Sequence, residues 1–359
     1  MLKNKFFRIG AGILLVFLII YVGSQIEWVF YPLVVLFQTL FIPIILAGFF
    51  YYLLRPVVKL FNKKLPATLS VLIVYIILIC LVIGFLVLIG PVLKKQLYSL
   101  LDSMPAIFAE IQKRLTNIKE MDFLQLEQVA EVLDLEHLFF ELGDLINRLI
   151  RYFTANISNI VGQLANTVLS LVIVPFILFY LLRDGDRLGE SIINLFREDK
   201  RELARSILSD IDQTLSAYIQ GHGLVCLCVG LLCYIAFLVI GLDYALLLAV
   251  IAGITEIIPY FGPWLGSIPA VIVGLFQSMG KGIIVIIVII IVQQIESNFI
   301  TPQVIGKKMK MHPIVIMLLI LLAGRLVGLI GMIMVVPLYA VSRVVVSYVL
   351  GVKRGEIKM

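Results

Sequence analysis

The segment GITEIIPYFGPWLGSIPA, from Gly253 to Ala270, decides the fold of this chain. It follows the apolar residues 246–252 and contains three glycines, three prolines and one glutamate. A second segment of the same kind, AGRLVGLIGMIMVVPLYA, runs from Ala323 to Ala340 behind the apolar residues 313–322. Unpaired backbone groups are costly in lipid, so helices broken at membrane depth line a cavity or pack inside protein. Two such breaks in one chain indicate the binding site of a transporter.

The composition predicts an integral membrane protein. Of the 359 residues, 61% are hydrophobic and 14% are charged, whereas soluble domains carry about 25% charged residues. The net charge of +6 is expected to reflect basic cytoplasmic loops. There is no basic stripe with interleaved aromatic residues, so we expect no nucleic-acid partner. No small-residue cleavage site follows the apolar run 11–22, which we therefore interpret as an uncleaved first span.

Hydropathy divides the chain into six parts, because runs of ~20 apolar residues can cross a membrane. Between the runs, apolar stripes with heptad-like spacing predict a helical hairpin that projects from the membrane. The predicted parts are N-terminal transmembrane helices at 1–93, an extramembrane helical hairpin at 94–151, a transmembrane helix at 152–182, a cytoplasmic charged linker with an amphipathic helix at 183–218, a C-terminal transmembrane core at 219–352, and a cytoplasmic tail at 353–359.

Basic residues in short loops set the orientation. Lys3, Lys5 and Arg8 predict a cytoplasmic N-terminus, and the hairpin at 94–151 is then external. If 244–278 crosses once, the basic residues near 307–310 lie outside, whereas a re-entrant hairpin leaves them inside. We favour two opposed broken-helix hairpins, 244–278 and 313–350, with a cytoplasmic C-terminus. Eight simple crossings are the alternative. The fold class is thus all-α and polytopic, with about seven or eight transmembrane or re-entrant segments.

No enzyme motif is present, such as HExxH, GxSxG, or the glycine-rich loops of nucleotide-binding folds. We predict a non-enzyme without a metal or another cofactor. The cysteines all lie in apolar runs and are expected to be buried free thiols. They are Cys80, Cys226, Cys228 and Cys233.

Glu256 is the first candidate site residue, because a carboxylate in hydrocarbon is costly and should face a cavity or a partner. It is predicted to bind a proton or cation, or to accept a hydrogen bond from a solute. The alternative is a structural ion pair or a helix cap at the break. A second group of candidates follows the apolar run 282–292, and its alternative is a helix end at the membrane interface. This group is Gln293, Gln294, Glu296 and Asn298.

Arg325 is the third candidate, between two glycines of the second break. It could neutralise Glu256 or Glu296, hold an anionic substrate, or extend to the membrane interface. The glycines and prolines at the breaks are predicted to free backbone groups that coordinate an ion or solute. Close helix packing is the alternative role. The residues of these breaks that we predict to lie on the substrate or ion pathway are Pro259, Gly262, Pro263, Gly266, Gly328 and Gly331.

Three motifs resemble the autoinducer-2 exporter family of bacterial permeases. They are EIIPYFGPWLGSIPA (256–270), QQIESNFITPQVIGKKMKMHP (293–313) and GLIGMIMVVPLYA (328–340). The order of spans, helical insert and charged linker is also similar across the chain. The resemblance implies a multi-span permease of the bacterial plasma membrane that forms homo-oligomers. It also implies transport of autoinducer-2 in some members and sodium/proton antiport in others.

The leading hypothesis is a permease that moves a small polar solute such as autoinducer-2 by alternating access. The second hypothesis is a Na⁺(Li⁺)/H⁺ antiporter, in which Glu256 or Glu296 carries the exchanged proton. The third is a membrane scaffold or sensor that acts through the external helices at 94–151. The expected partners are the lipid bilayer and either a small polar solute or a monovalent cation and protons.

Overall fold

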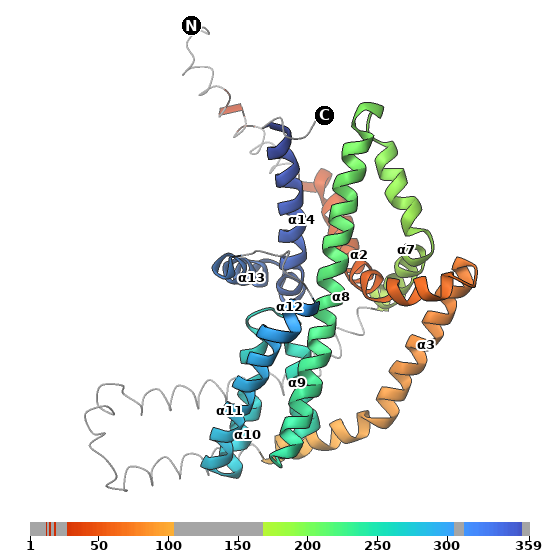
Figure 1. Ribbon diagram of the computed structural model, residues 1–359. Coiled ribbons are helices and arrows are strands. Elements are labelled where there is room, and N and C mark those ends of the chain that lie inside the picture. The colour runs from red at the N-terminus through yellow and green to blue at the C-terminus, as the bar shows by residue number, and fades with distance from the viewer. Residues whose placement is uncertain are drawn as a thin grey trace.

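The computed structural model describes residues 27–103, 168–304 and 312–353, together with four residues between 12 and 18. Regular structure within these ranges is helical (Figure 1). Within the described residues, five helices are long and apolar enough to cross a membrane, which confirms the all-α polytopic fold. Their spans are Thr39–Asn62, Ala67–Leu88, Glu198–Val239, Met279–Val304 and Leu329–Tyr348, and the shorter apolar helices are Ala245–Thr255, Gly262–Gln277 and Pro313–Val327.

Helices α2 (Glu27–Asn62), α3 (Ala67–Leu88) and α7 (Val168–Asn194) pack together at one side of the molecule. Their shared core contains Ala47, Val58, Val71, Val74, Leu178 and Leu182. The sequence predicted that the span within α7 would end at residue 182, but the helix continues through the charged residues 183–187 to Asn194. The hairpin predicted at 94–151 lies outside the described residues beyond residue 103.

Helix α8 (Arg201–Val239) is preceded by the short helix η1 (Glu198–Lys200) and joins the two halves of the molecule. The sequence predicted a surface helix that runs into a membrane span, and the structure joins both in one helix without a break. Its 39 residues extend about 58 Å at 1.5 Å per residue, well beyond the ~30 Å hydrocarbon thickness. One end therefore projects from the apolar layer, and this is the charged N-terminal end.

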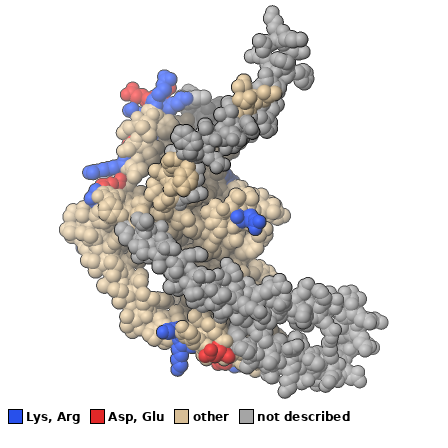
Figure 2. Space-filling model, turned by 180° about the vertical axis from the view of Figure 1, so that it is seen from behind, with Lys and Arg blue, Asp and Glu red and all other residues tan. Residues whose placement is uncertain are grey.

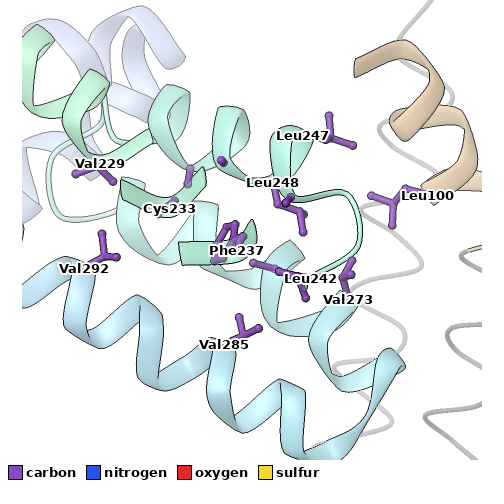
Figure 3. Packing of buried hydrophobic residues seen from close by; sticks show 14 of the residues in the cluster. Leu100, Val229, Cys233, Phe237, Leu242, Leu247, Leu248, Val273, Val285 and Val292 are labelled. Atoms are coloured by element: carbon purple, nitrogen blue, oxygen red, sulfur yellow. The ribbon is translucent and has the colours of Figure 1, made fainter. Parts of the chain in front are cut away.

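Helices α9 (Ala245–Thr255), α10 (Gly262–Gln277) and α11 (Met279–Ile295) surround the C-terminal half of α8. Figure 3 shows Phe237 and Cys233 of α8 pointing into the space between these helices, with Val285 and Val292 of α11 opposite. Leu100, on the helical residues 90–103, reaches the same cluster. At 11 and 16 residues, α9 and α10 are about 16 and 24 Å long. Each is shorter than the hydrocarbon layer.

The chain continues through the π-helical turn η2 (Glu296–Ile300) and the short helix α12 (Thr301–Val304). Helix α14 (Leu329–Lys353) then packs on the N-terminal half of α8, and α13 (Pro313–Val327) packs on α14. Ile316 and Ile320 of α13 are buried there against Tyr218 and Ile219 of α8. This core also contains Ile258 from the turn between α9 and α10, so the second broken segment packs against the first.

Figure 2 shows charged side chains in small separate groups, at both ends, on one side and near the middle of this face, with uncharged residues over most of the described surface. Many large apolar side chains of the outer surface are exposed, such as Leu81 and Leu227. This is the distribution expected for a surface in contact with lipid. Cys233 is buried as predicted, whereas Cys80 is exposed on α3 because its side chain lies on this apolar outer face.

Candidate functional site

The first break packs α9 and α10 against each other as an antiparallel pair. A Cβ added at Gly262 would lie 2.2 Å from the carbonyl oxygen of Thr255, and one at Gly266 would lie 2.7 Å from Cα of Ala252. Real Cβ atoms do not approach so closely, so only glycine lets the two backbones meet. This close approach fixes the turn between the helices, where Glu256 and Pro259 lie.

Glu256 caps the C-terminal end of α9, where its N–H donates to the carbonyl of Ala252 at 3.1 Å. The side chain is only 5% exposed, and its Oε2 has no hydrogen-bond partner among the described residues. A buried oxygen without a partner is costly, because it has lost water without gaining a donor. Such an atom marks a place where a proton or a ligand can be accommodated.

A small cavity of about 10 Å³ lies beside this carboxylate. Its polar lining comes from Glu256, Gln293 of α11 and Ser267 of α10. Its apolar lining includes Cys233 and Phe237 of α8, which Figure 3 shows between the surrounding helices. A cavity needs about 10–15 Å³ to hold one water molecule. The space therefore suits a water molecule or a bare monovalent cation rather than an organic solute.

Gln293 and Glu296 complete the polar surroundings of Glu256. Gln293 lines the same cavity as the Glu256 carboxylate, and Glu296 lies close enough to interact with that carboxylate electrostatically. Glu296 is itself held by the hydroxyl of Thr301, which donates to its Oε1. Carboxylate, amide and hydroxyl oxygens are ligands suited to hard cations. The structure thus brings two carboxylates and one amide together at the first break.

The other predicted site residues are placed elsewhere. Gln294 and Asn298 are exposed and bond to each other, with the Asn298 amide donating to Gln294 Oε1 at 2.8 Å. Arg325 is exposed on α13, and the described residues show no ion pair between it and Glu256 or Glu296. Gly328 and Gly331 belong to the second break. Pro263 and Gly266 line the cavity beside Glu256.

His222 is a residue at this site that the sequence did not single out, because the three histidines are far apart in the chain. Its Nε2 lies 3.2 Å from the carbonyl oxygen of Ile257, directly after Glu256. A carbonyl only accepts, so Nε2 carries the hydrogen. The imidazole also stacks on the ring of Tyr218 at 5.3 Å between centroids. His222 therefore ties the break to α8.

Hydrogen bonds from the helical residues 90–103 hold the N-terminal end of α9. Gln96 Oε1 accepts from the N–H of Leu247 at 2.9 Å, and the Tyr244 hydroxyl shares hydrogen bonds with Ser99 and Ser103. Tyr244 adopts a left-handed backbone conformation, with φ of 59°, which is uncommon outside glycine. The helical residues 90–103 therefore hold one end of α9, and Glu256 stands at the other.

A multi-pass bundle with a buried, incompletely partnered carboxylate at a broken helix defines an integral membrane transporter. The chain belongs to the AI-2E transporter family, because the family described as AI-2E family transporter matches residues 12–351.

Individual relatives agree with this assignment. The chain is 38% identical to YueF of Bacillus subtilis over 96% of this chain and 93% of that protein. It is 34% identical to YrrI of the same organism, over 94% of both chains. PerM of Escherichia coli is 28% identical over 88% of this chain and 89% of its own length. The names of the first two give transport as a provisional function, that of the third gives permease, and none states a substrate.

Proposed function

We propose that the protein is a secondary transporter of the bacterial plasma membrane, in which Glu256 exchanges a proton for a monovalent cation. The observation that carries this proposal is the unpartnered Oε2 of Glu256 beside a cavity the size of one water molecule. A proton or a dehydrated Na⁺ or Li⁺ ion fits this space, and either would give the oxygen the partner that it lacks.

The neighbouring groups support exchange rather than permanent cation binding. Glu296 stands near Glu256, and two carboxylates at close range disfavour the doubly charged state. A cation or a proton relieves that repulsion, so the two ligands compete for the same charge. Competition of this kind is what couples an inward flux of one ion to an outward flux of the other.

The arrangement of the helices supports movement at the same place. The α9–α10 pair lies between α8 and α11, and neither member is long enough to cross the membrane alone. A re-entrant pair that shifts against a longer scaffold helix exposes its tip alternately to the two sides. We include this re-entrant arrangement, and cytoplasmic N- and C-termini, in the proposal.

The test is ion exchange in proteoliposomes that contain purified protein and an internal pH-sensitive dye. Pulses of Na⁺, Li⁺ or K⁺ outside should change the internal pH for the wild type. Glu256→Gln should abolish this response with unchanged assembly. Glu198→Gln makes the same chemical change at a side chain that is 90% exposed, and it should respond like the wild type.

Two results would count against cation exchange. The first is an absent response in correctly assembled wild-type protein, and the second is a Glu256→Gln variant that exchanges at the wild-type rate. If the Glu198→Gln control also lost ion exchange, the loss in Glu256→Gln would reflect general damage to the protein rather than a role of Glu256 in exchange.

Export of a small hydroxylated solute such as autoinducer-2 is the second candidate function. It is supported by family membership and by uncharged amides at the end of α11 and in η2, of which Gln294 and Asn298 are exposed. Such a solute needs a larger space than the cavity beside Glu256 provides. Labelled autoinducer-2 in the same proteoliposomes distinguishes the two, because only the solute exporter would move it.

A further inference from the structure

A second polar cavity lies between α2 and α7, at the C-terminal end of the span Thr39–Asn62. It has a volume of about 80 Å³, and it shares no lining residue with the cavity beside Glu256. The proposed exchange of a proton and a cation at Glu256 does not involve this second cavity. The cavity lies at the polar end of a membrane span, so its lining residues indicate what kind of group it can bind.

Four hydrogen-bond donors line this cavity from one face of α2. Tyr51, Arg55, Lys59 and Asn62 follow one another at helical spacing and all contribute to the wall. Residues at such spacing share one side of a helix. Gly185 of α7 faces them, and a Cβ there would lie 3.0 Å from the Tyr51 hydroxyl. Glycine at this position lets α7 approach the stripe of donors.

The guanidinium group of Arg55 makes a close ion pair through Nη1 and a longer, more exposed one through Nη2. Its Nη1 donates to both carboxylate oxygens of Asp212 on α8, each at 2.7 Å. Its Nη2 lies 3.5 Å from Asp186, whose side chain is 89% exposed. An ion pair with so exposed a partner contributes little. The second edge of the guanidinium is thus available to another acceptor.

Lys59 carries the uncompensated charge of the cavity. Arg183, which also lines it, is neutralised by Asp184 at 2.6 Å, and Asp212 neutralises Arg55. No ion pair engages Lys59 within the described residues, and the side chain of Asp186, which also lines the cavity, is 89% exposed. Lys63 and Lys64 follow one turn later and add to the positive potential. The cavity therefore favours an anion that accepts several hydrogen bonds.

We propose that this cavity binds the phosphate of an anionic phospholipid headgroup. Arg55 and Lys59 would hold the phosphate oxygens, and the Asn62 amide and the Tyr51 hydroxyl would donate further hydrogen bonds. A phospholipid is the occupant because the donors lie where a membrane span ends, which is the depth of lipid phosphates. Basic pockets between transmembrane helices bind lipid headgroups in this way.

The test uses purified full-length protein in detergent, with lipid binding followed by native mass spectrometry and by the midpoint of thermal unfolding. Phosphatidylglycerol should bind and raise the midpoint more than phosphatidylcholine, whose cationic headgroup meets Lys59 unfavourably. Lys59→Gln should weaken phosphatidylglycerol binding about fivefold, the share expected of one lysine near a membrane surface. Lys59→Arg should restore binding.

Lys200→Gln is the matched control, because it removes the same charge from an exposed position outside the cavity. It should bind phosphatidylglycerol like the wild type. Equal binding by wild type and Lys59→Gln would overturn the proposal, as would equal binding of the two lipids. Protection by inorganic phosphate alone, as strong as that by phosphatidylglycerol, would assign the cavity to free phosphate and overturn the lipid assignment.

Discussion

The two broken segments of this protein look alike in sequence but differ in structure. In the first, six residues separate α9 from α10, and the break buries a carboxylate between α8 and α11. In the second, Gly328 alone separates α13 from α14, and the nearby Leu326 and Leu329 are 72% and 60% exposed. Glycine and proline thus determine where a helix breaks. The surrounding helices determine whether the break becomes a polar site.

The glycines give the sharpest test of this difference. Gly262→Ala places a Cβ against the backbone of Thr255, which cannot yield, and should lower the free energy of unfolding by about 3 kcal/mol. Gly324→Ala meets only the end of the flexible Met332 side chain and should be tolerated. Thermal unfolding in detergent measures both. Equal destabilisation would mean that the Met332 side chain yields no more readily than the Thr255 backbone. The second helix pair has a backbone contact of its own, since a Cβ at Gly331 would lie 2.4 Å from the carbonyl oxygen of Ala323.

In the second break, substitution of Gly328 is expected to destabilise the protein through backbone strain rather than through a steric clash. Gly328 has φ of 72° and ψ of −151°, a conformation nearly restricted to glycine, which costs other residues about 1–3 kcal/mol. An added Cβ would meet no neighbouring atom. Gly328→Ala should therefore lower the unfolding midpoint through backbone strain alone. An unchanged midpoint would show that the segment relaxes freely.

His222 should matter to the first break as a hydrogen-bond donor. His222→Phe keeps the ring against Tyr218 but leaves the Ile257 carbonyl without its donor, at a cost of about 1–3 kcal/mol. His222→Gln retains an N–H donor and should recover both stability and ion exchange. Failure of the glutamine variant in exchange alone, with stability restored, would instead indicate that the imidazole itself takes part in proton transfer.

The smallest effect is expected at Arg325 in the second segment. Its side chain is exposed, so Arg325→Gln should change stability by less than about 0.5 kcal/mol and leave ion exchange near the wild-type rate. The flux assay with both Glu256→Gln and Arg325→Gln compares the two segments directly. A complete loss with Arg325→Gln would place a functional residue in the second break after all.

Much of this organisation could be predicted from the sequence, because membrane spans and helix breaks leave local signals. The apolar runs, the two breaks and the importance of Glu256 as a candidate all follow from hydropathy and from glycine and proline positions. The continuation of α7 to Asn194 did not, since the charged residues after 182 mark the end of an apolar run but not the end of a helix.

The partners of Glu256 were harder to predict, because they come from separate parts of the chain. Gln293 was a candidate on its own helix, but its place beside the first break depends on how α11 packs against α8 and α10. His222 had no motif to mark it, and Ser267 lies in the first broken segment but was not singled out as a candidate there. A histidine on an apolar helix face gives no signal until its acceptor, here the freed carbonyl of Ile257, is known.

The π-helical turn η2 affects which insertions and deletions the sequence around this site can tolerate. A π turn accommodates one more residue than an α turn, and it brings Glu296 beside Thr301, five positions later. Since the π turn absorbs this extra residue, deleting one residue from 297–300 would convert it to an α turn and leave the residues that follow facing nearly the same way. A one-residue deletion should therefore be tolerated inside η2, whereas the same deletion within α11 would turn the residues that follow by about 100°.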